Sequence, residues 1–266
     1  MEQELYWRLG VFITILAVIA LWETFQPKRP WHLSRMTRWT NHILLSMFNT
    51  IVVRLIIPLT AAAYALTLEL EGIGLLNWLG LPVWISIVVA VLILDLAIYV
   101  QHVWFHKLEF FWRFHRMHHT DLDFDVTTGV RFHPIEIVIS MLIKFAVISL
   151  LGPPAVAVIV FEVLLNATSM FNHGNIRIPV PVDRILRLFL VTPDMHRVHH
   201  SEIRNETDSN FGFNLPWWDR IFGTYRDQPQ EGHLGMSIGL PIFRSNQETR
   251  LDRLISQPFR KPQLEQ

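Results

Sequence analysis

Long apolar runs separated by short polar segments dominate the first 170 residues. A transmembrane helix needs about 20 consecutive apolar residues, with a range of roughly 17–25. Runs of about this length cover residues 6–22, 43–66 and 72–94. The third run has no charged residue before Asp95, and Pro82 is expected near the first turn of its helix. Arg54 interrupts the second run, so we expect its side chain to face protein or water.

The fourth apolar region, residues 135–170, is predicted to form a helical hairpin. Its only charged residues are Glu136, Lys144 and Glu162. Gly152, Pro153 and Pro154 lie in its middle, and they disfavour a continuous helix because proline lacks a backbone N–H and clashes with the preceding turn. Each half has about 17 residues, which is the lower limit for a membrane span. The sequence therefore predicts that the chain turns back here.

Lysine and arginine in short loops indicate the cytoplasmic side of a membrane protein. The segment 25–42 carries the basic residues Lys28, Arg29, Arg35 and Arg38. The segment 67–82 has no basic residue. We therefore expect segment 25–42 in the cytoplasm and the end of the third helix, near His102, on the same side. A hairpin at 135–170 then leaves the histidine-rich segments before and after it in that compartment, whereas a single span would separate them.

Composition supports a membrane protein, with 51% hydrophobic and 17% charged residues. The formal net charge is zero, so nothing indicates a nucleic-acid partner. The absence of cysteine excludes thiolate nucleophiles and cysteine-ligated clusters. We predict an all-α integral membrane protein with about four transmembrane helices, plus or including the hairpin, and a cytoplasmic helical cap. The expected parts are N-terminal transmembrane helices at 1–94, a catalytic domain at 95–230 and a tail at 231–266, loosely held after residue 247.

Eight of the 13 histidines form three boxes with the spacing of metal sites. The boxes are H-V-W-F-H (His102, His106), H-R-M-H-H (His115, His118, His119) and H-R-V-H-H (His196, His199, His200). Side chains three or four positions apart share a helical face, and imidazole is the commonest metal ligand. Adjacent side chains diverge by about 100° on a helix, so a single ion cannot readily bind both members of a doublet. The boxes therefore predict two metal ions a few ångströms apart.

Several other polar residues are weaker candidates. His133 and His173 lie just outside the ends of the hairpin, and we include both among the predicted ligands. Asp95 lies seven positions before His102 and is expected to accept the free N–H of a ligating imidazole. We expect a solvated loop for Asp121, Asp123 and Asp125, and surface positions for His32, His42 and His233.

The three boxes, with "RFHP", "NHGN" and "DMHRVHHSEIRNETDSNFGFNLPWWDRIFGTY", resemble the sterol desaturase/fatty acid hydroxylase superfamily, in particular its bacterial branch. The resemblance covers about residues 95–225. It implies a membrane-bound non-haem di-iron oxygenase whose box histidines bind two Fe ions, and His133 and His173 match further histidines of the family. With O2 as co-substrate, the implied reaction is hydroxylation or desaturation of a C–H bond in a fatty acyl, sterol or related lipid.

Oxygen activation requires electrons, and the chain has neither cysteine nor a recognisable fused haem or nucleotide module. We therefore expect a separate electron donor: a ferredoxin, cytochrome or reductase. The basic residues expected to dock an acidic donor are Lys107, Arg113, Arg116, Arg197 and Arg204. Two alternatives stay open, a histidine-rich membrane metal transporter and a bis-His haem protein. Zinc also binds imidazole, so the boxes leave the native metal undecided.

Overall fold

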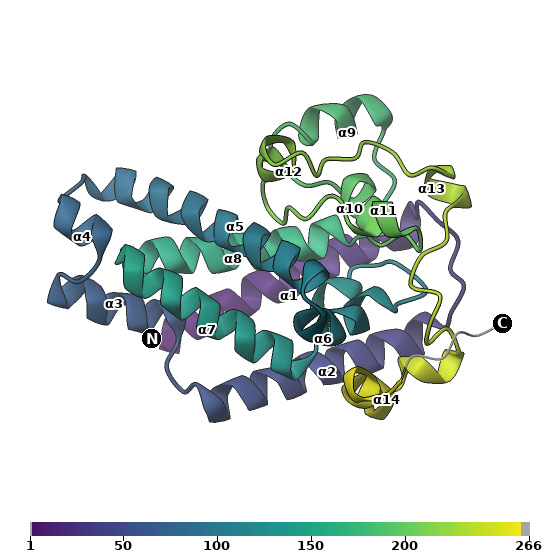
Figure 1. Cartoon of the computed structure of the whole chain (residues 1–266), viewed down its shortest axis with the longest axis horizontal. Coiled ribbons are helices and arrows are strands. Elements are labelled where there is room, and N and C mark those ends of the chain that lie inside the picture. The colour runs from purple at the N-terminus through teal and green to yellow at the C-terminus, as the bar shows by residue number, and fades with distance from the viewer. Residues whose placement is uncertain (1, 262–266) are drawn as a thin grey trace.

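The computed structural model describes residues 2–261, and every regular element within this range is helical. Two isolated bridges, Pro27 with Ile176 and Ser201 with Ile238, are the β-type pairings among these residues. Long helices run side by side as an elongated bundle, and most of the short helices gather at one end of it, whereas α4 (Leu75–Leu79) lies at the other end (Figure 1). The predicted all-α architecture is confirmed.

Five stretches of the chain are long and apolar enough to cross a membrane: Tyr6–Phe25, Arg35–Leu79, Val83–Lys107, Pro134–Leu151 and Ala155–Asn172. Their helices are α1 (Glu2–Phe25), α2 (Arg35–Ile56), α3 (Ala61–Glu71), α4 (Leu75–Leu79), α5 (Val83–Lys107), α7 (Pro134–Leu151) and α8 (Ala155–Asn172). Large apolar side chains such as Leu55, Leu70 and Leu150 are exposed on the outside of the bundle. An apolar exterior of this kind suits contact with lipid.

The second predicted span, residues 43–66, is not one helix. α2 already begins at Arg35, where the Ser34 hydroxyl accepts a backbone N–H of the first turn. α2 ends before Pro58, which has no N–H to continue the helical hydrogen bonds. The Thr60 hydroxyl then caps the start of α3. The apolar pattern alone indicated neither the start of the helix at Arg35 nor its interruption between Ile56 and Ala61.

The third predicted run, residues 72–94, is divided between α4 and α5, but the helix start near Pro82 and the turn at residues 152–154 are confirmed. α5 begins at Val83, directly after Pro82. α7 ends at Leu151, its cap residue Gly152 has a left-handed backbone conformation (φ 59°), and α8 begins after Pro154. The turn is tightly packed, because a Cβ built on Gly152 would lie 2.2 Å from the backbone oxygen of Ile73. α8 therefore returns to the end of the bundle from which α7 starts (Figure 1).

Two apolar clusters hold the long helices together. One joins α5, α7 and α8 through Leu94, Ile148 and Phe161. The second joins α1 to α8 through Ile19 and Met170. In a membrane, such side-chain packing is a main attraction between helices. It fixes the relative positions of α5 and α8, whose last turns lead into the histidine-rich end of the bundle.

The short helices cover that end. They are α6 (Glu109–His119), α9 (Val180–Leu186), α10 (Pro193–His199), α11 (Arg204–Thr207), α12 (Trp217–Ile221), α13 (Gly232–Gly235), α14 (Leu251–Ser256) and the 3-10 turns η1 (Thr128–Val130), η2 (Asn246–Thr249) and η3 (Gln257–Phe259). The expectation of a loose tail after residue 247 is wrong for the described residues up to 261. There, Leu254 is fully buried against Leu45 of α2 and Met117 of α6.

Candidate metal centre

Nine histidines converge where the ends of α5 and α8 meet α6 and α10. His102 and His106 lie at the end of α5, His115, His118 and His119 on α6, His173 at the C-terminal cap of α8, His196 and His199 on α10, and His200 at its C-terminal cap. Each of the nine side chains is at most 3% exposed. Only Leu108 separates α5 from α6, so their histidine boxes are brought together by a single sharp turn.

The nine histidines form two groups, and within each group one ring nitrogen per residue lies within 4.8 Å of the others. The first histidine group contains His102, His106, His115, His119 and His199. The second histidine group contains His118, His173, His196 and His200. Both doublets are divided, since His118 and His119 fall in different groups and so do His199 and His200. Neighbouring imidazoles therefore belong to two different groups, each of which could hold a metal ion.

Within each group, imidazole Nε2 atoms face one another at short range. The shortest pairs are His102–His115 (3.1 Å), His106–His119 (3.1 Å), His118–His173 (3.2 Å) and His173–His196 (3.1 Å). Metal–imidazole distances of about 2.0–2.1 Å place neighbouring ligand nitrogens about 3 Å apart around one ion. The observed spacing therefore matches nitrogens that share a metal.

The outer nitrogens of several rings are held by backbone carbonyl groups. The Nδ1 contacts are His102 to Phe211 O (2.7 Å), His173 to Ser169 O (2.7 Å), His199 to Ser209 O (2.7 Å) and His118 to Arg131 O (3.2 Å). A carbonyl oxygen only accepts, so Nδ1 carries the proton in these rings and Nε2 keeps a lone pair. Two lone pairs facing each other repel unless a cation lies between them. The residues of both groups thus fit metal ions.

Burial also sets the charge of the histidines. It lowers the pKa of His199 to about 3 and the pKa of His173 to about 4. Burial, together with the nearby histidines, moves the pKa values of His118, His196 and His200 well below the usual range. These rings are therefore neutral near pH 7, which is the form that binds metal.

The carboxylate that orients a box histidine belongs to Glu136, which the prediction missed. Glu136 Oε1 accepts a hydrogen bond from His115 Nδ1 at 2.7 Å. Asp95, expected in this role, instead accepts from the Trp218 indole N–H at 2.8 Å and from the backbone N–H of Leu215. Asp95 therefore holds α12 and the residue Leu215 before it against α5. The sequence did contain a signal for Glu136, because it is a carboxylate in the first turn of the apolar helix α7, and acidic residues within membrane helices are costly and usually functional.

The structure does not bring His133 to either group, although the sequence placed it among the ligands. Its Nδ1 accepts the backbone N–H of Ile135 at 3.2 Å and so caps α7, while its Nε2 lies 3.1 Å from Ile255 O. The capping position turns the ring toward α14. His173, the other weaker candidate, lies inside the second histidine group.

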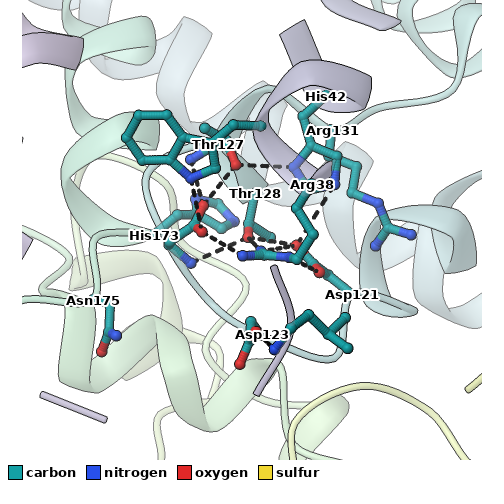
Figure 2. A network of polar contacts seen from close by, with 12 residues as sticks. Arg38, His42, Asp121, Asp123, Thr127, Thr128, Arg131, His173 and Asn175 are labelled. Atoms are coloured by element: carbon teal, nitrogen blue, oxygen red, sulfur yellow. Dashed lines mark hydrogen bonds and ion pairs between the residues drawn. The ribbon is translucent and has the colours of Figure 1, made fainter. Parts of the chain in front are cut away.

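A buried polar network supports the second histidine group (Figure 2). Three aspartates that were expected in a solvated loop are at most 4% exposed: Asp121, Asp123 and Asp125. Arg38 of α2 donates hydrogen bonds to Asp121 at 2.6 and 2.9 Å and pairs with Asp125. His42, expected at the surface, is fully buried and belongs to the same network. Because these side chains are buried, both surface expectations are wrong; Figure 2 draws the network together with His173 of the second histidine group.

Two basic residues expected to dock an electron donor are buried. Arg197 is fully buried and pairs with Asp194, while Arg116 donates to backbone oxygens of η3 and the residue after it. His233, another expected surface residue, lies 3.7 Å from Asp194. The basic residues of the expected set that are exposed are Lys107, Arg113 and Arg204.

A cavity of about 400 Å³ lies beside the first histidine group. His102 and His115 line it at one side, and residues of α1, α2, α7 and α8 form its walls. Its volume lies within the range of about 300–1,000 Å³ that is typical of sites for small molecules. The cavity therefore gives a ligand inside the helical bundle access to the histidines.

The chain matches one known protein family over the part that contains the histidines. The family model for fatty acid hydroxylases matches residues 87–224, more than half of the chain. The matched range contains all nine clustered histidines, Glu136 and the hairpin. No solved structure gives a significant match.

Curated relatives are similar at modest identity. An ornithine lipid hydroxylase of Rhizobium tropici is 26% identical over 247 residues, covering 89% of this chain and 72% of the relative. The alkylglycerol monooxygenase of Homo sapiens is 28% identical over 155 residues, covering 56% of this chain and 32% of the relative. A fatty acid hydroxylase of a Lecanicillium species is 27% identical over 179 residues, covering 62% and 48%. The aligned part is thus about a third of the human relative and about half of the fungal one.

Proposed function

The chain belongs to the fatty acid hydroxylase family, and from this premise we propose that it is an integral-membrane, non-haem di-iron oxygenase that oxidises a C–H bond of a lipid. The observation that carries the proposal is the division of both histidine doublets between two buried groups with facing Nε2 atoms. Two iron ions bound there would supply the redox chemistry that couples O2 and two external electrons to the oxidation of an unactivated C–H bond.

The protein's own residues would prepare the site in three ways. Carbonyl groups and Glu136 hold Nδ1 of five rings, which fixes the direction of each Nε2 lone pair. Burial keeps the histidines neutral and limits access of bulk water to the reacting groups. The cavity beside His102 and His115 would hold the lipid with one carbon close to the first histidine group.

Hydroxylation is the first product to seek, because the relatives carry the names of hydroxylases and monooxygenases. The balanced reaction is R–H, O2, two electrons and two protons giving R–OH and water. We propose that a separate redox protein supplies the electrons and approaches the exposed residues Lys107, Arg113 and Arg204. We also propose a cytoplasmic position for the site, since segment 25–42 on the same side is basic.

The alternatives receive less support. A transporter site lies near the middle of the membrane between helices, whereas these histidines lie at and beyond the helix ends. A bis-His haem needs two axial histidines, and here groups of five and four converge. Neither alternative explains the divided doublets.

The test is 18O2 labelling of membrane lipids in cells that express the chain, followed by mass spectrometry. We expect a lipid that carries one 18O atom in cells with the wild-type chain, and no such labelled lipid in cells that express His118→Ala or His199→Ala. Each of these substitutions removes one histidine from one of the two groups. His32→Ala is the matched control, because His32 is exposed and lies outside both groups. Label-free lipids with the wild-type chain, at full iron occupancy, would refute the proposal.

A further inference from the structure

One part of the cap, the short helices at the histidine-rich end, packs against the side of α5 rather than beyond its end. The indole N–H of Trp218 in α12 donates to Asp95 of α5 at 2.8 Å. The ring of Phe222, directly after α12, stacks on Tyr99 of α5 with the ring centroids 5.3 Å apart. Both α5 residues lie well inside Val83–Lys107, which is long and apolar enough to cross a membrane. α12 therefore lies beside a candidate membrane span (Figure 1).

Two exposed tryptophans of α5 indicate the depth of this contact. Trp84 and Trp104 are twenty positions apart, which is about 30 Å along a helix at 1.5 Å per residue. This length matches the hydrocarbon core of a bilayer, about 30 Å, and tryptophan is enriched at both of its interfaces. Asp95 lies nine positions before Trp104 and Tyr99 lies five, so they are about 14 Å and about 8 Å inside that interface. α12 therefore contacts α5 at the level of the hydrocarbon.

The exposed surface of this part of the cap is apolar. Large apolar side chains on or just after α9 and α12 are 40–66% exposed: Ile185, Leu188, Phe189, Trp217, Ile221 and Phe222. The indole N–H of Trp217 donates to the backbone oxygen of Leu188 at 2.7 Å, so the two segments form one surface, which we call the apolar cap face. A contiguous apolar surface of this kind marks contact with a membrane or with another protein.

The charged residues of this region are divided by sign. The acidic residues of α9 and α12, Asp183 and Asp219, are buried, and Asp219 accepts hydrogen bonds from two backbone N–H groups. The basic residues Arg184 and Arg220 of the same two helices are exposed. Asp227, an exposed acid nearby in the sequence, is paired with a buried arginine. Apolar side chains accompanied by exposed arginines suit the cytoplasmic leaflet, because arginine reaches head groups from an apolar surface and this leaflet carries anionic lipids.

We propose that the apolar cap face inserts into the leaflet beside α5, and that Arg184 and Arg220 contact the phosphates of anionic lipids. The inference rests on the proposed membrane-spanning position of α5 and does not depend on the oxygenase activity. Amphipathic segments in the membrane plane bury their apolar side about 5–10 Å into the boundary between head groups and acyl chains. The level of Phe222, which stacks on Tyr99, agrees with this depth. Lipid is favoured over a second copy of the chain because lipid surrounds α5 at this level in any membrane that α5 spans.

Fluorescence quenching of single labels tests the depth of the apolar cap face. The chain has no cysteine, so one introduced cysteine at a time can carry an NBD fluorophore. Ile221→Cys labels the apolar cap face, Val88→Cys labels an exposed position of α5 between its two tryptophans, and Glu231→Cys labels an exposed position directly before α13. The metal-loaded protein is reconstituted into vesicles of phosphatidylcholine and phosphatidylglycerol. The quenchers are lipids with a doxyl group on the acyl chain and iodide in the water.

We expect doxyl lipids to quench the Ile221 label as strongly as the Val88 label, and iodide to quench only the Glu231 label. Iodide quenching at Ile221, without doxyl quenching, would show that the face lies in water and would overturn the inference. Protection of the Ile221 label from both quenchers would show that a second copy or another protein covers the face, which also overturns it. Iodide quenching at Val88 would refute the spanning position of α5 and the inference with it, whereas the oxygenase proposal is decided separately by 18O labelling.

The contribution of the two arginines is tested by lipid composition. In nanodiscs, the unfolding temperature of the metal-loaded wild-type chain should be higher with phosphatidylglycerol present than with phosphatidylcholine alone. The double variant Arg184→Gln with Arg220→Gln should lose this difference. Arg220 also donates to the backbone oxygen of Arg187, so the variant is compared with itself in the two lipid mixtures. Arg250→Gln is the control, since Arg250 is an exposed cation next to α14, and it should keep the difference. An unchanged difference in the double variant contradicts the proposed contact with anionic lipids.

Discussion

At the scale of single residues, Glu136 connects the cavity to the histidines through one hydrogen bond to His115. Carboxylates that hold a ligating imidazole typically contribute 10–100-fold to metal affinity. We expect Glu136→Gln to lower affinity for ferrous iron by about this factor, because an amide holds the ring less strongly. Anaerobic iron titration measures it. Glu109→Gln is the control, since Glu109 is an exposed acid in the first turn of α6, and this variant should bind iron as the wild type does. An unaltered iron affinity of Glu136→Gln would contradict the role proposed for Glu136.

The buried histidines predict a pH dependence for the metal-free chain. The folded-state pKa values of His173 (about 4) and His199 (about 3) lie below the unfolded value near 6.5. The unfolded chain therefore binds protons first, and stability present above pH 6.5 is lost as pH falls toward 4, by about 1.4 kcal/mol per pH unit for each histidine. Burial raises the pKa of Asp219 to about 6, which opposes this trend at one residue.

Thermal unfolding of chelator-treated protein in detergent checks this dependence. The unfolding temperature should decrease as the pH is lowered from 7.5 to 5. His173→Gln should make this decrease with pH less steep, because it removes one histidine whose pKa is lowered in the folded chain. A midpoint that stays constant or rises over this interval would show that the histidines are not held neutral in the folded chain.

Residue types and spacing predicted the divided doublets, since the 100° step between neighbours is a local property of a helix. They did not predict the partners of those residues. The bond between Glu136 and His115 joins two helices, and Asp95 meets Trp218 across 123 positions. The pattern of residues in a single sequence does not indicate which distant residues pair. His133 is a similar case, because its role as the cap of α7 depends on the backbone conformation just before that helix.

At the scale of elements, the hairpin turn determines whether the two histidine-rich segments meet. Gly152 has φ 59°, and a Cβ there would lie 2.2 Å from Ile73 O. We expect Gly152→Ala to destabilise the protein by about 1–3 kcal/mol from backbone strain, with more from the clash. It should also lower metal occupancy, because α8 carries His173 at its end.

The measurement is thermal unfolding together with metal analysis of the purified variant. Gly10→Ala is the matched control, since Gly10 lies on α1 with nothing within 4 Å of the added Cβ and should keep full stability and occupancy. Equal stability of Gly152→Ala and the wild type would show that the turn rearranges easily, which contradicts the close packing of Gly152 against Ile73.

Helix-breaking residues explain which elements were predictable. Gly152, Pro153 and Pro154 interrupt an apolar region where nothing else competes, and the hairpin followed from them. Pro58 carries the same signal inside the run 43–66, but the apolar pattern on both sides favoured one continuous span. The polar start of α2 was missed because Arg38 and His42 look like surface residues until Asp121 and Asp125 are placed against them.

At the scale of the whole molecule, the sequence predicted an all-helical membrane protein with its histidines together at one end of the bundle. The cavity was not predictable, because its wall combines α1, α2, α5, α7 and α8, and each contributes only a few polar positions. The buried network of Arg38 likewise joins residues 83 or more positions apart. Such features depend on tertiary contacts that a single sequence does not specify.

We propose that each chain holds two iron ions, one in each histidine group. Anaerobic titration of the metal-free protein with ferrous iron, quantified by mass spectrometry against amino-acid analysis, tests it most directly. We predict saturation at two irons per chain, and at no more than one for His118→Ala and for His199→Ala. Saturation of the wild-type chain at a single iron would contradict the two-centre account.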